Sequence, residues 1–142
     1  MKFAAVLSCA AVAAAAAVGK RDITFKVSDF SADCVEHSLN CAINFKVIQP
    51  GTMETTPTRC FAVVGAKGGR LPDVVKEGKC ETSRTFDLVR GPEGFTFTVS
   101  QQVTPASNQT GSRLLPNSDF FISNEPNAVV ERYQGPTNFD LV

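Results

Sequence analysis

The chain has 142 residues, of which 43% are hydrophobic, and its 14 basic side chains are balanced by 14 acidic ones. Nucleic-acid binding needs Lys and Arg clustered on one face, whereas the densest basic group, Lys67 with Arg70, lies in a glycine-rich turn. This composition argues against a nucleic-acid partner. With one histidine and no tryptophan, the chain also supplies few groups for catalysis or for stacking sugar rings.

The first 21 residues predict a secretory signal peptide. Lys2 gives a positive start, residues 3–18 are small and apolar, and small residues precede the expected cleavage point. A membrane span needs about 20 strongly apolar residues, and this alanine-rich run is shorter, so we expect cleavage and no membrane span. Lys20-Arg21 is a dibasic processing site, and cleavage there starts the mature protein at Asp22. The expected product is secreted, extracellular and mildly acidic.

Residues 22–142 are enough for one domain and too few for two. The signal peptide removes Cys9 and leaves four cysteines, for which three pairings exist. Chain order and spacing favour Cys34 with Cys41 and Cys60 with Cys80. A zinc site is the alternative, but it requires CxxC-like or Cys-His spacings that this chain lacks. We therefore expect two disulfides and neither a metal nor another cofactor.

The first half of the domain reads as β-strands. Apolar and polar residues alternate over residues 23–28 and again over 43–47, as in half-buried strands. Residues 60–64 are more continuously apolar, which is typical of a central strand. Residues 72–78, PDVVKEG, allow one turn of helix because proline suits the first helical position.

The second half continues the pattern. A strand near Phe86 leads into the turn at residues 91–94, and residues 95–103 form the longest alternation in the chain. The polar segment 103–118, with two prolines and no alternation, predicts an exposed loop. Strands are expected at 118–123 and 128–133, with residues 139–141 closing an edge. Seven or eight short strands predict an all-β fold, an antiparallel β-barrel or sandwich.

Two surface features stand out in this second half. Asn108 begins the sequon Asn108-Gln109-Thr110, which is a glycosylation site if the protein is exported and an unused match otherwise. Phe120 and Phe121 are adjacent in an expected strand and must point to opposite faces. One of them could therefore contribute to an interaction patch, although covering a sheet edge is the simpler interpretation.

Catalytic residues are not indicated by the sequence. Any Ser-His-Asp or Cys-His arrangement would have to use His37, which lies between Cys34 and Cys41. A histidine in a small disulfide loop is more often a solvated side chain than a base. We therefore expect that the protein is not an enzyme.

Four segments carry a resemblance to a known family: ITFKVSDF, SLNCAINFKVI, the cysteine that opens RCFAVV, and the cysteine before TFDLV. They resemble the Alternaria major-allergen family, small secreted fungal proteins that include the hypersensitive response-inducing elicitors. The resemblance covers Ile23 to Val89 best and implies a compact β-barrel or sandwich, together with roles in plant infection, host-defence recognition or small-molecule binding. By position, Cys60 and Cys80 match the family's hairpin-bridging pair. The chain departs from the family in having no cysteine after Cys80.

Two functions remain open on this basis, and a weaker third, inhibition of a host hydrolase, would need only an exposed rigid loop, which the sequence does not distinguish. The first is a secreted effector or elicitor that binds a plant extracellular or cell-surface protein through its loops and modulates or triggers defence, with a role in virulence. The second is an extracellular carrier of a small apolar ligand, because a barrel of about eight strands can hold one.

Overall fold

The computed structural model describes residues 22–37, 39–125 and 128–142. The predicted signal peptide and the Lys20-Arg21 site lie outside these residues. The described chain is nearly all β-structure and contains no α-helix, which confirms the predicted fold class. Across the same residues, no helix has the length and hydropathy needed to cross a bilayer.

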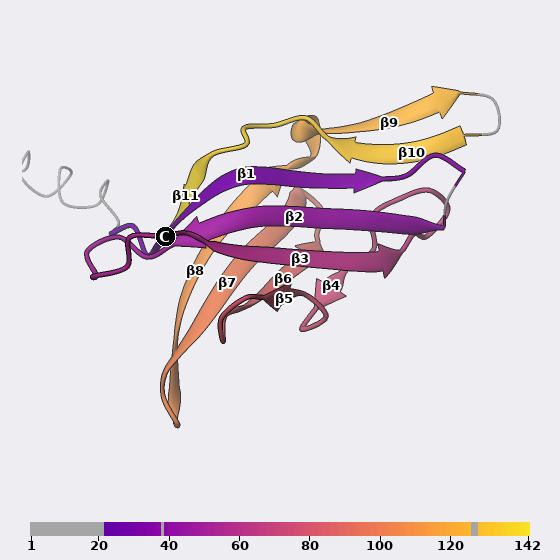
Figure 1. Cartoon of the computed structure of the whole chain (residues 1–142). Coiled ribbons are helices and arrows are strands. Elements are labelled where there is room, and N and C mark those ends of the chain that lie inside the picture. Colours follow the sequence, from indigo (N-terminus) through magenta and orange to yellow (C-terminus); the bar gives the residue numbers. More distant parts are fainter. Residues whose placement is uncertain (1–21, 38, 126–127) are drawn as a thin grey trace, which may run out of the picture.

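The strands form two antiparallel sheets that pack face to face (Figure 1). The larger sheet has the order β5-β3-β2-β1-β10-β9, with β11 also paired to β1. Its strands are β1 (Phe25–Cys34), β2 (Asn40–Ile48), β3 (Thr58–Gly65), β5 (Lys79–Cys80), β9 (Phe120–Glu125), β10 (Ala128–Tyr133) and β11 (Phe139–Leu141). The smaller sheet has the order β4-β6-β7-β8. Its strands are β4 (Val74–Val75), β6 (Thr85–Arg90), β7 (Gly94–Thr104) and β8 (Ser107–Pro116), and a short 3-10 turn, η1 (Asn117–Asp119), leads from β8 to β9.

Of the two predicted architectures, barrel and sandwich, the structure has the sandwich. The sheets come closest to joining at one side, where the backbones of Ser112 and Val142 exchange two hydrogen bonds of 2.9 and 3.2 Å. Because β11 also pairs with β1, this contact ties β8 of the smaller sheet to the larger sheet. The sandwich is therefore linked along one edge without closing into a barrel.

Strand β1 contains a β-bulge that changes which residues face the core. Phe25 and Val27 are buried in alternation, the register then shifts between Ser28 and Ser31, and Phe30 becomes buried at 2% exposure. Asp29 adopts the left-handed conformation at this point, with φ of 53°. The extra residue keeps the second half of the strand in phase with the core.

Aromatic rings fill the space between the sheets. The neighbouring rings of Phe30, Phe45, Phe86 and Phe97 have centroids 4.8–6.2 Å apart, mostly in edge-to-face arrangements. Such pairs contribute energy beyond the area they bury. These four phenylalanines are therefore core residues.

Both disulfides have the pairing that spacing favours. Cys34 bonds Cys41 and Cys60 bonds Cys80. In each case the two cysteines are direct cross-strand partners, Cys34 and Cys41 in the β1–β2 hairpin and Cys60 and Cys80 between β3 and β5. The first pair was expected in a loop, but β1 and β2 extend to include both cysteines.

The prediction of an exposed loop over residues 103–118 is wrong. Most of this segment is β8, which pairs with β7 along its length from Ser107 to Pro116. One proline, Pro105, lies in the turn, and Pro116 ends the strand, so neither interrupts the pairing. The hairpin projects well beyond the larger sheet (Figure 1), so both faces near its tip are exposed and no apolar alternation is required there.

Three smaller expectations are also corrected. Residues 72–78 form no helical turn, because Val74 and Val75 pair with β6 as strand β4. The strand expected from residue 118 begins at Phe120, after η1. Ile23 precedes β1 and is 39% exposed, so the apolar face of that strand starts at Phe25.

Candidate functional site

The outward face of the larger sheet exposes large apolar side chains. Cys60, Ala62 and Val64 of β3 face the core, whereas Phe61 is 50% exposed and Val63 is 66% exposed. The apolar run 60–64 predicted a central strand, and β3 does have a neighbour on each side, β5 and β2, but only one of its faces is buried. Strand β3 lies next to the sheet edge, and nothing among the described residues covers its outer face.

Strand pairing extends this face across the sheet. In register, Val63 lies opposite Ala42, Ala42 opposite Asp33, Asp33 opposite Arg132, and Arg132 opposite Phe121. Directly opposed residues of antiparallel strands project from the same face. Phe61, Val63 and Phe121 therefore lie on one face, but Asp33 and Arg132 separate Phe121 from the other two. We call Phe61, Val63 and Ala42 the outer-face patch.

A shallow groove of about 270 Å³ borders Phe61. Its charged lining consists of Asp29, Lys46, Arg59 and Glu81. Lys46 Nζ lies 3.3 Å from Asp29 Oδ2, while Arg59 lies opposite Lys46 in the register of β2 and β3. The groove thus combines an exposed aromatic ring with charges of both signs, a surface suited to contact with a protein.

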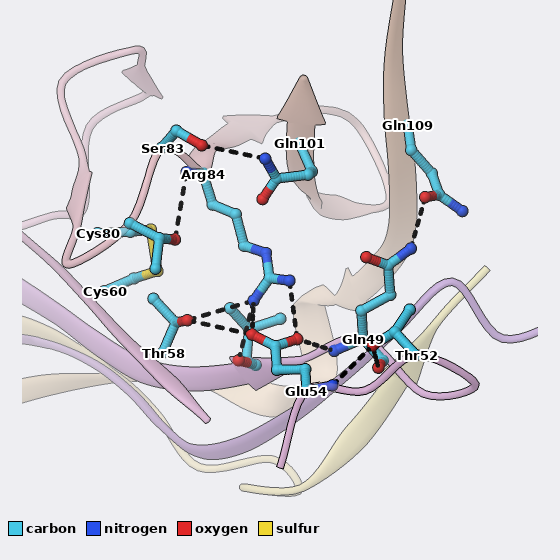
Figure 2. A network of polar contacts seen from close by, with 12 residues as sticks. Gln49, Thr52, Glu54, Thr58, Cys60, Cys80, Ser83, Arg84, Gln101 and Gln109 are labelled. Carbon is cyan, nitrogen blue, oxygen red and sulfur yellow. Dashed lines mark hydrogen bonds and ion pairs between the residues drawn. A yellow bond between two sulfur atoms is a disulfide. The ribbon is translucent and has the colours of Figure 1, made fainter. Parts of the chain in front are cut away.

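Figure 2 shows a polar network that fixes the loop between β2 and β3. The Arg84 guanidinium donates two hydrogen bonds of 2.8 Å to the Glu54 carboxylate, and the backbone N–H of Gln49 donates a third, also 2.8 Å. Arg84 is 6% exposed and Glu54 is 22% exposed. The hydrogen bonds from Arg84 hold the pKa of Glu54 below its usual value of 4.5, outweighing the opposing effect of burial.

The Arg84 side chain is anchored in the fold beyond this ion pair. Its Nη1 also donates to the Val47 carbonyl and the Thr58 hydroxyl, at 3.4 and 3.3 Å. The guanidinium carbon lies 5.4 Å from the centroid of the Phe25 ring, within cation–π range. A cation so placed is a structural clamp rather than a group available to a substrate.

A second ion pair, of which the glutamate is buried, is structural in the same way. Glu131 of β10 is 2% exposed and accepts hydrogen bonds from Arg90 at 2.5 Å and from the Leu71 N–H at 2.9 Å. Arg90 belongs to β6 and stacks over Phe95 at 4.3 Å. The pair joins the two sheets at the end of the sandwich opposite the Arg84–Glu54 loop.

The residues considered for chemistry are separated in space. His37 lies in the β1–β2 turn, has a left-handed φ of 59° and is exposed. In the described part of the chain, no group of three or more His, Cys, Asp or Glu side chains is placed to hold a metal ion. Tyr133 has a pKa raised to about 12, chiefly by burial, and its hydroxyl donates to the Pro136 carbonyl at 2.7 Å. This hydroxyl supports the fold and is a poor proton acceptor or donor.

The other predicted surface residues are accounted for as follows. Phe120 and Phe121 do point to opposite faces: Phe120 packs against Phe95 and Tyr133, while Phe121 is 52% exposed. Only Phe121 is therefore available to an interaction patch. Asn108 is exposed on β8 near the hairpin tip, opposite Gln102.

Sequence reasoning missed Phe61, Val63 and the Arg84–Glu54 clamp. The alternation of β3 was present in the sequence, but apolar residues on both faces obscured it. No local signal pairs Arg84 with Glu54, which are 30 residues apart.

Comparisons of the chain with models of known families, with curated proteins and with solved structures found no match.

Proposed function

We propose that the protein is a secreted, effector-like or elicitor-like binding protein of a fungus, which acts outside the cell on a plant extracellular or cell-surface protein. The observation that carries this proposal is the outer-face patch, an exposed apolar surface on a rigid sandwich with two disulfides. Exposed apolar patches with polar rims are characteristic of protein interaction sites. The resemblance of residues 23–89 to the Alternaria major-allergen family supports the same function.

Binding, and no chemical transformation, is the proposed activity. Phe61 and Val63 form the apolar centre, and Lys46 and Arg59 contribute to a charged rim. Buried aromatic residues supply most of the affinity of protein interfaces, while rim charges affect association rate and specificity. A rigid sheet also loses little conformational freedom on binding.

Secretion belongs to the same proposal. The predicted signal peptide directs export, and the two disulfides are of the kind that form in the secretory pathway. We expect the exported protein to begin at Asp22. Sequencing of its N-terminus after expression in a fungal host tests this point, and retention of the first 21 residues would contradict it.

The carrier hypothesis receives less support. A ligand inside the sandwich would need space, but aromatic rings are packed against each other there at centroid distances of 4.8–6.2 Å. The groove beside Phe61 is open, and its volume of about 270 Å³ is just below the roughly 300 Å³ at which typical small-molecule pockets begin. We therefore place the binding activity on the surface.

The experiment is infiltration of purified protein, residues 22–142, into leaves, with the defence response measured as ion leakage or oxidative burst. We expect the wild type to give a response, and the double variant Phe61→Ser/Val63→Ser to lose it. The matched control is Val75→Ser, which removes an apolar side chain of 49% exposure from β4 in the other sheet. A wild-type protein without any response, and without effect on virulence when its gene is deleted, would count against the proposal.

A further inference from the structure

A second surface, different from the outer-face patch, is formed by the loop between β2 and β3, residues 49–57. Its tip carries Met53, which is 98% exposed. Among the exposed large hydrophobic side chains of the described residues, none is more exposed. An apolar side chain held entirely in solvent contributes nothing to folding, although the loop around it is strongly fixed.

The segment before Met53 is held by local hydrogen bonds. The Thr52 hydroxyl donates to the Gln49 carbonyl at 2.9 Å and accepts a 3.2 Å hydrogen bond from the Glu54 N–H. The Gln49 side chain in turn donates to Gln109 of β8 at 2.5 Å. These contacts connect the loop to the β7–β8 hairpin (Figure 2).

The residue after Met53 is held by the core. Glu54 is clamped by Arg84, and the same carboxylate accepts the Gln49 N–H from the other side of the loop. Arg84 follows Cys80 by four residues, and the Cys60–Cys80 disulfide attaches that segment to β3. The backbone on both sides of Met53 is therefore tied to one carboxylate and, through it, to the interior.

We propose that Thr52-Met53-Glu54 is a substrate-like inhibitory loop, which occupies the active-site cleft of a serine endopeptidase with an apolar S1 pocket and places Met53 in that pocket. Met is unbranched and flexible at its end, so it can enter a deep apolar pocket. A loop held in one conformation by these hydrogen bonds loses less conformational entropy on binding than a flexible substrate does. Complexes of proteases with rigid inhibitors are among the tightest of their size.

The bracing also explains why such a loop would inhibit rather than be consumed. If the protease serine attacks, its Oγ bonds to the Met53 carbonyl carbon, the Met53–Glu54 peptide bond breaks, and the Glu54 nitrogen takes up the serine's proton. The Glu54 carboxylate remains held by Arg84 and Gln49, so the new amine stays beside the acyl group. Reversal, which re-forms the peptide bond and returns the proton to the serine, is then favoured over diffusion of the leaving segment.

The test measures inhibition of purified chymotrypsin and subtilisin by the protein, residues 22–142, with a small chromogenic substrate. We expect competitive inhibition with Ki below about 1 µM, the weak end of interfaces of this size. Met53→Lys should weaken inhibition of chymotrypsin by about 100-fold and create inhibition of trypsin, whose S1 pocket holds a carboxylate. Because Met53 is in solvent, this variant keeps the wild-type fold, which circular dichroism verifies.

Two further variants make the test specific. Leu39→Lys places the same charge at an 84% exposed apolar residue of another turn and should leave both Ki values unchanged. Glu54→Ala should convert the inhibitor into a substrate, cleaved between residues 53 and 54 at least about ten times faster than the wild type.

Three results would each overturn the proposal. They are absence of wild-type inhibition at 50 µM, a limit of about −6 kcal/mol in binding, rapid cleavage of the wild type at this bond, and failure of Met53→Lys to inhibit trypsin. Phe61→Ser/Val63→Ser should inhibit normally, so this outcome is independent of the proposed function.

Discussion

Two glutamates, one on β10 and one in the β1–β2 turn, show how burial determines the contribution of an ion pair to stability. Glu131 is 2% exposed and bonded to Arg90, whereas Glu36 is 47% exposed and bonded to Arg132 at 3.1 Å. Removing one partner of a buried pair leaves an uncompensated charge, which is costly. Exposed pairs contribute little, because solvent screens both charges.

We therefore predict that Glu131→Ala lowers the free energy of unfolding by about 2–3 kcal/mol, because it leaves the Leu71 N–H without its acceptor and removes the ion pair with Arg90, which keeps its hydrogen bond to the Leu71 carbonyl. Glu36→Ala, which removes an exposed partner, should cost less than about 1 kcal/mol. Urea unfolding of the wild type and both variants measures these differences. Similar losses for the two substitutions would contradict the assignment of Glu131 as a buried clamp.

The Arg84–Glu54 clamp predicts a dependence of stability on pH. The pKa of Glu54 is lowered in the folded protein, so the folded state binds fewer protons than the unfolded state when Glu54 titrates. The stabilisation is complete above the usual pKa of 4.5 and is lost as pH falls through the lower, folded value. Wild type should thus exceed Glu54→Gln in unfolding free energy at pH 7, and the difference should shrink below pH 4.5.

Chemical denaturation of both proteins at several pH values between 7 and 3 measures this difference. The other carboxylates are present in both proteins, so the subtraction isolates Glu54. A difference that stays constant down to pH 3 would show that the clamp is not ionised in the way described.

At the scale of the secondary-structure element, alternation predicted the long strands well, because each has one face in the core. Residues 95–103, for example, lie within β7, where Phe95, Phe97 and Val99 are buried, although Val103 near the hairpin tip is 55% exposed. The same rule failed for β8, whose outer half is exposed on both faces and therefore carries no apolar phase. It also failed for β4 and β5, two residues each, which are too short to show a period. The bulge at Asp29 breaks the period within β1 and concealed Phe30 as a core residue.

The two disulfides give a prediction at this scale. In the chain-entropy model the stabilisation grows with the number of residues enclosed, here a separation of 20 for Cys60–Cys80 and 7 for Cys34–Cys41. Replacing both cysteines by alanine should therefore lower the free energy of unfolding by about 3.3 kcal/mol for Cys60–Cys80 and by about 2.5 kcal/mol for Cys34–Cys41. Denaturation of the two double variants measures the order, and a larger loss for Cys34→Ala/Cys41→Ala would contradict the model.

The β7–β8 hairpin also determines whether Asn108 can be modified. Its side chain is exposed on a strand that projects from the body, opposite Gln102, so the sequon is accessible. We predict that secretion from a eukaryotic host adds one N-linked glycan, seen as a mass decrease on treatment with an endoglycosidase. Asn108→Gln should abolish this shift with less than about 0.5 kcal/mol change in stability, as expected for an exposed position. An unshifted wild-type band would show that the sequon is unused.

At the scale of the whole molecule, the sequence predicted the fold class but not how its two sheets meet. Local alternation says which face of each strand is buried, and it does not say which strands become neighbours. The contacts that join the sheets are long-range: Arg90 with Glu131, and Ser112 with Val142. The outer-face patch and the Arg84–Glu54 clamp likewise depend on residues that only the tertiary structure brings together.

The seam between the sheets yields a final prediction. Leu141 of β11 is fully buried, and its Cβ lies beside Gly111 of β8, where an added Cβ would be only 3.0 Å away. Leu141→Ala therefore creates a cavity where both sheets meet and should cost about 3 kcal/mol in a single cooperative transition. Leu39→Ala, at 84% exposure, should cost almost nothing. If Leu141→Ala instead produced two separate transitions by fluorescence and circular dichroism, the sheets would be folding independently and the sandwich would not be one cooperative unit.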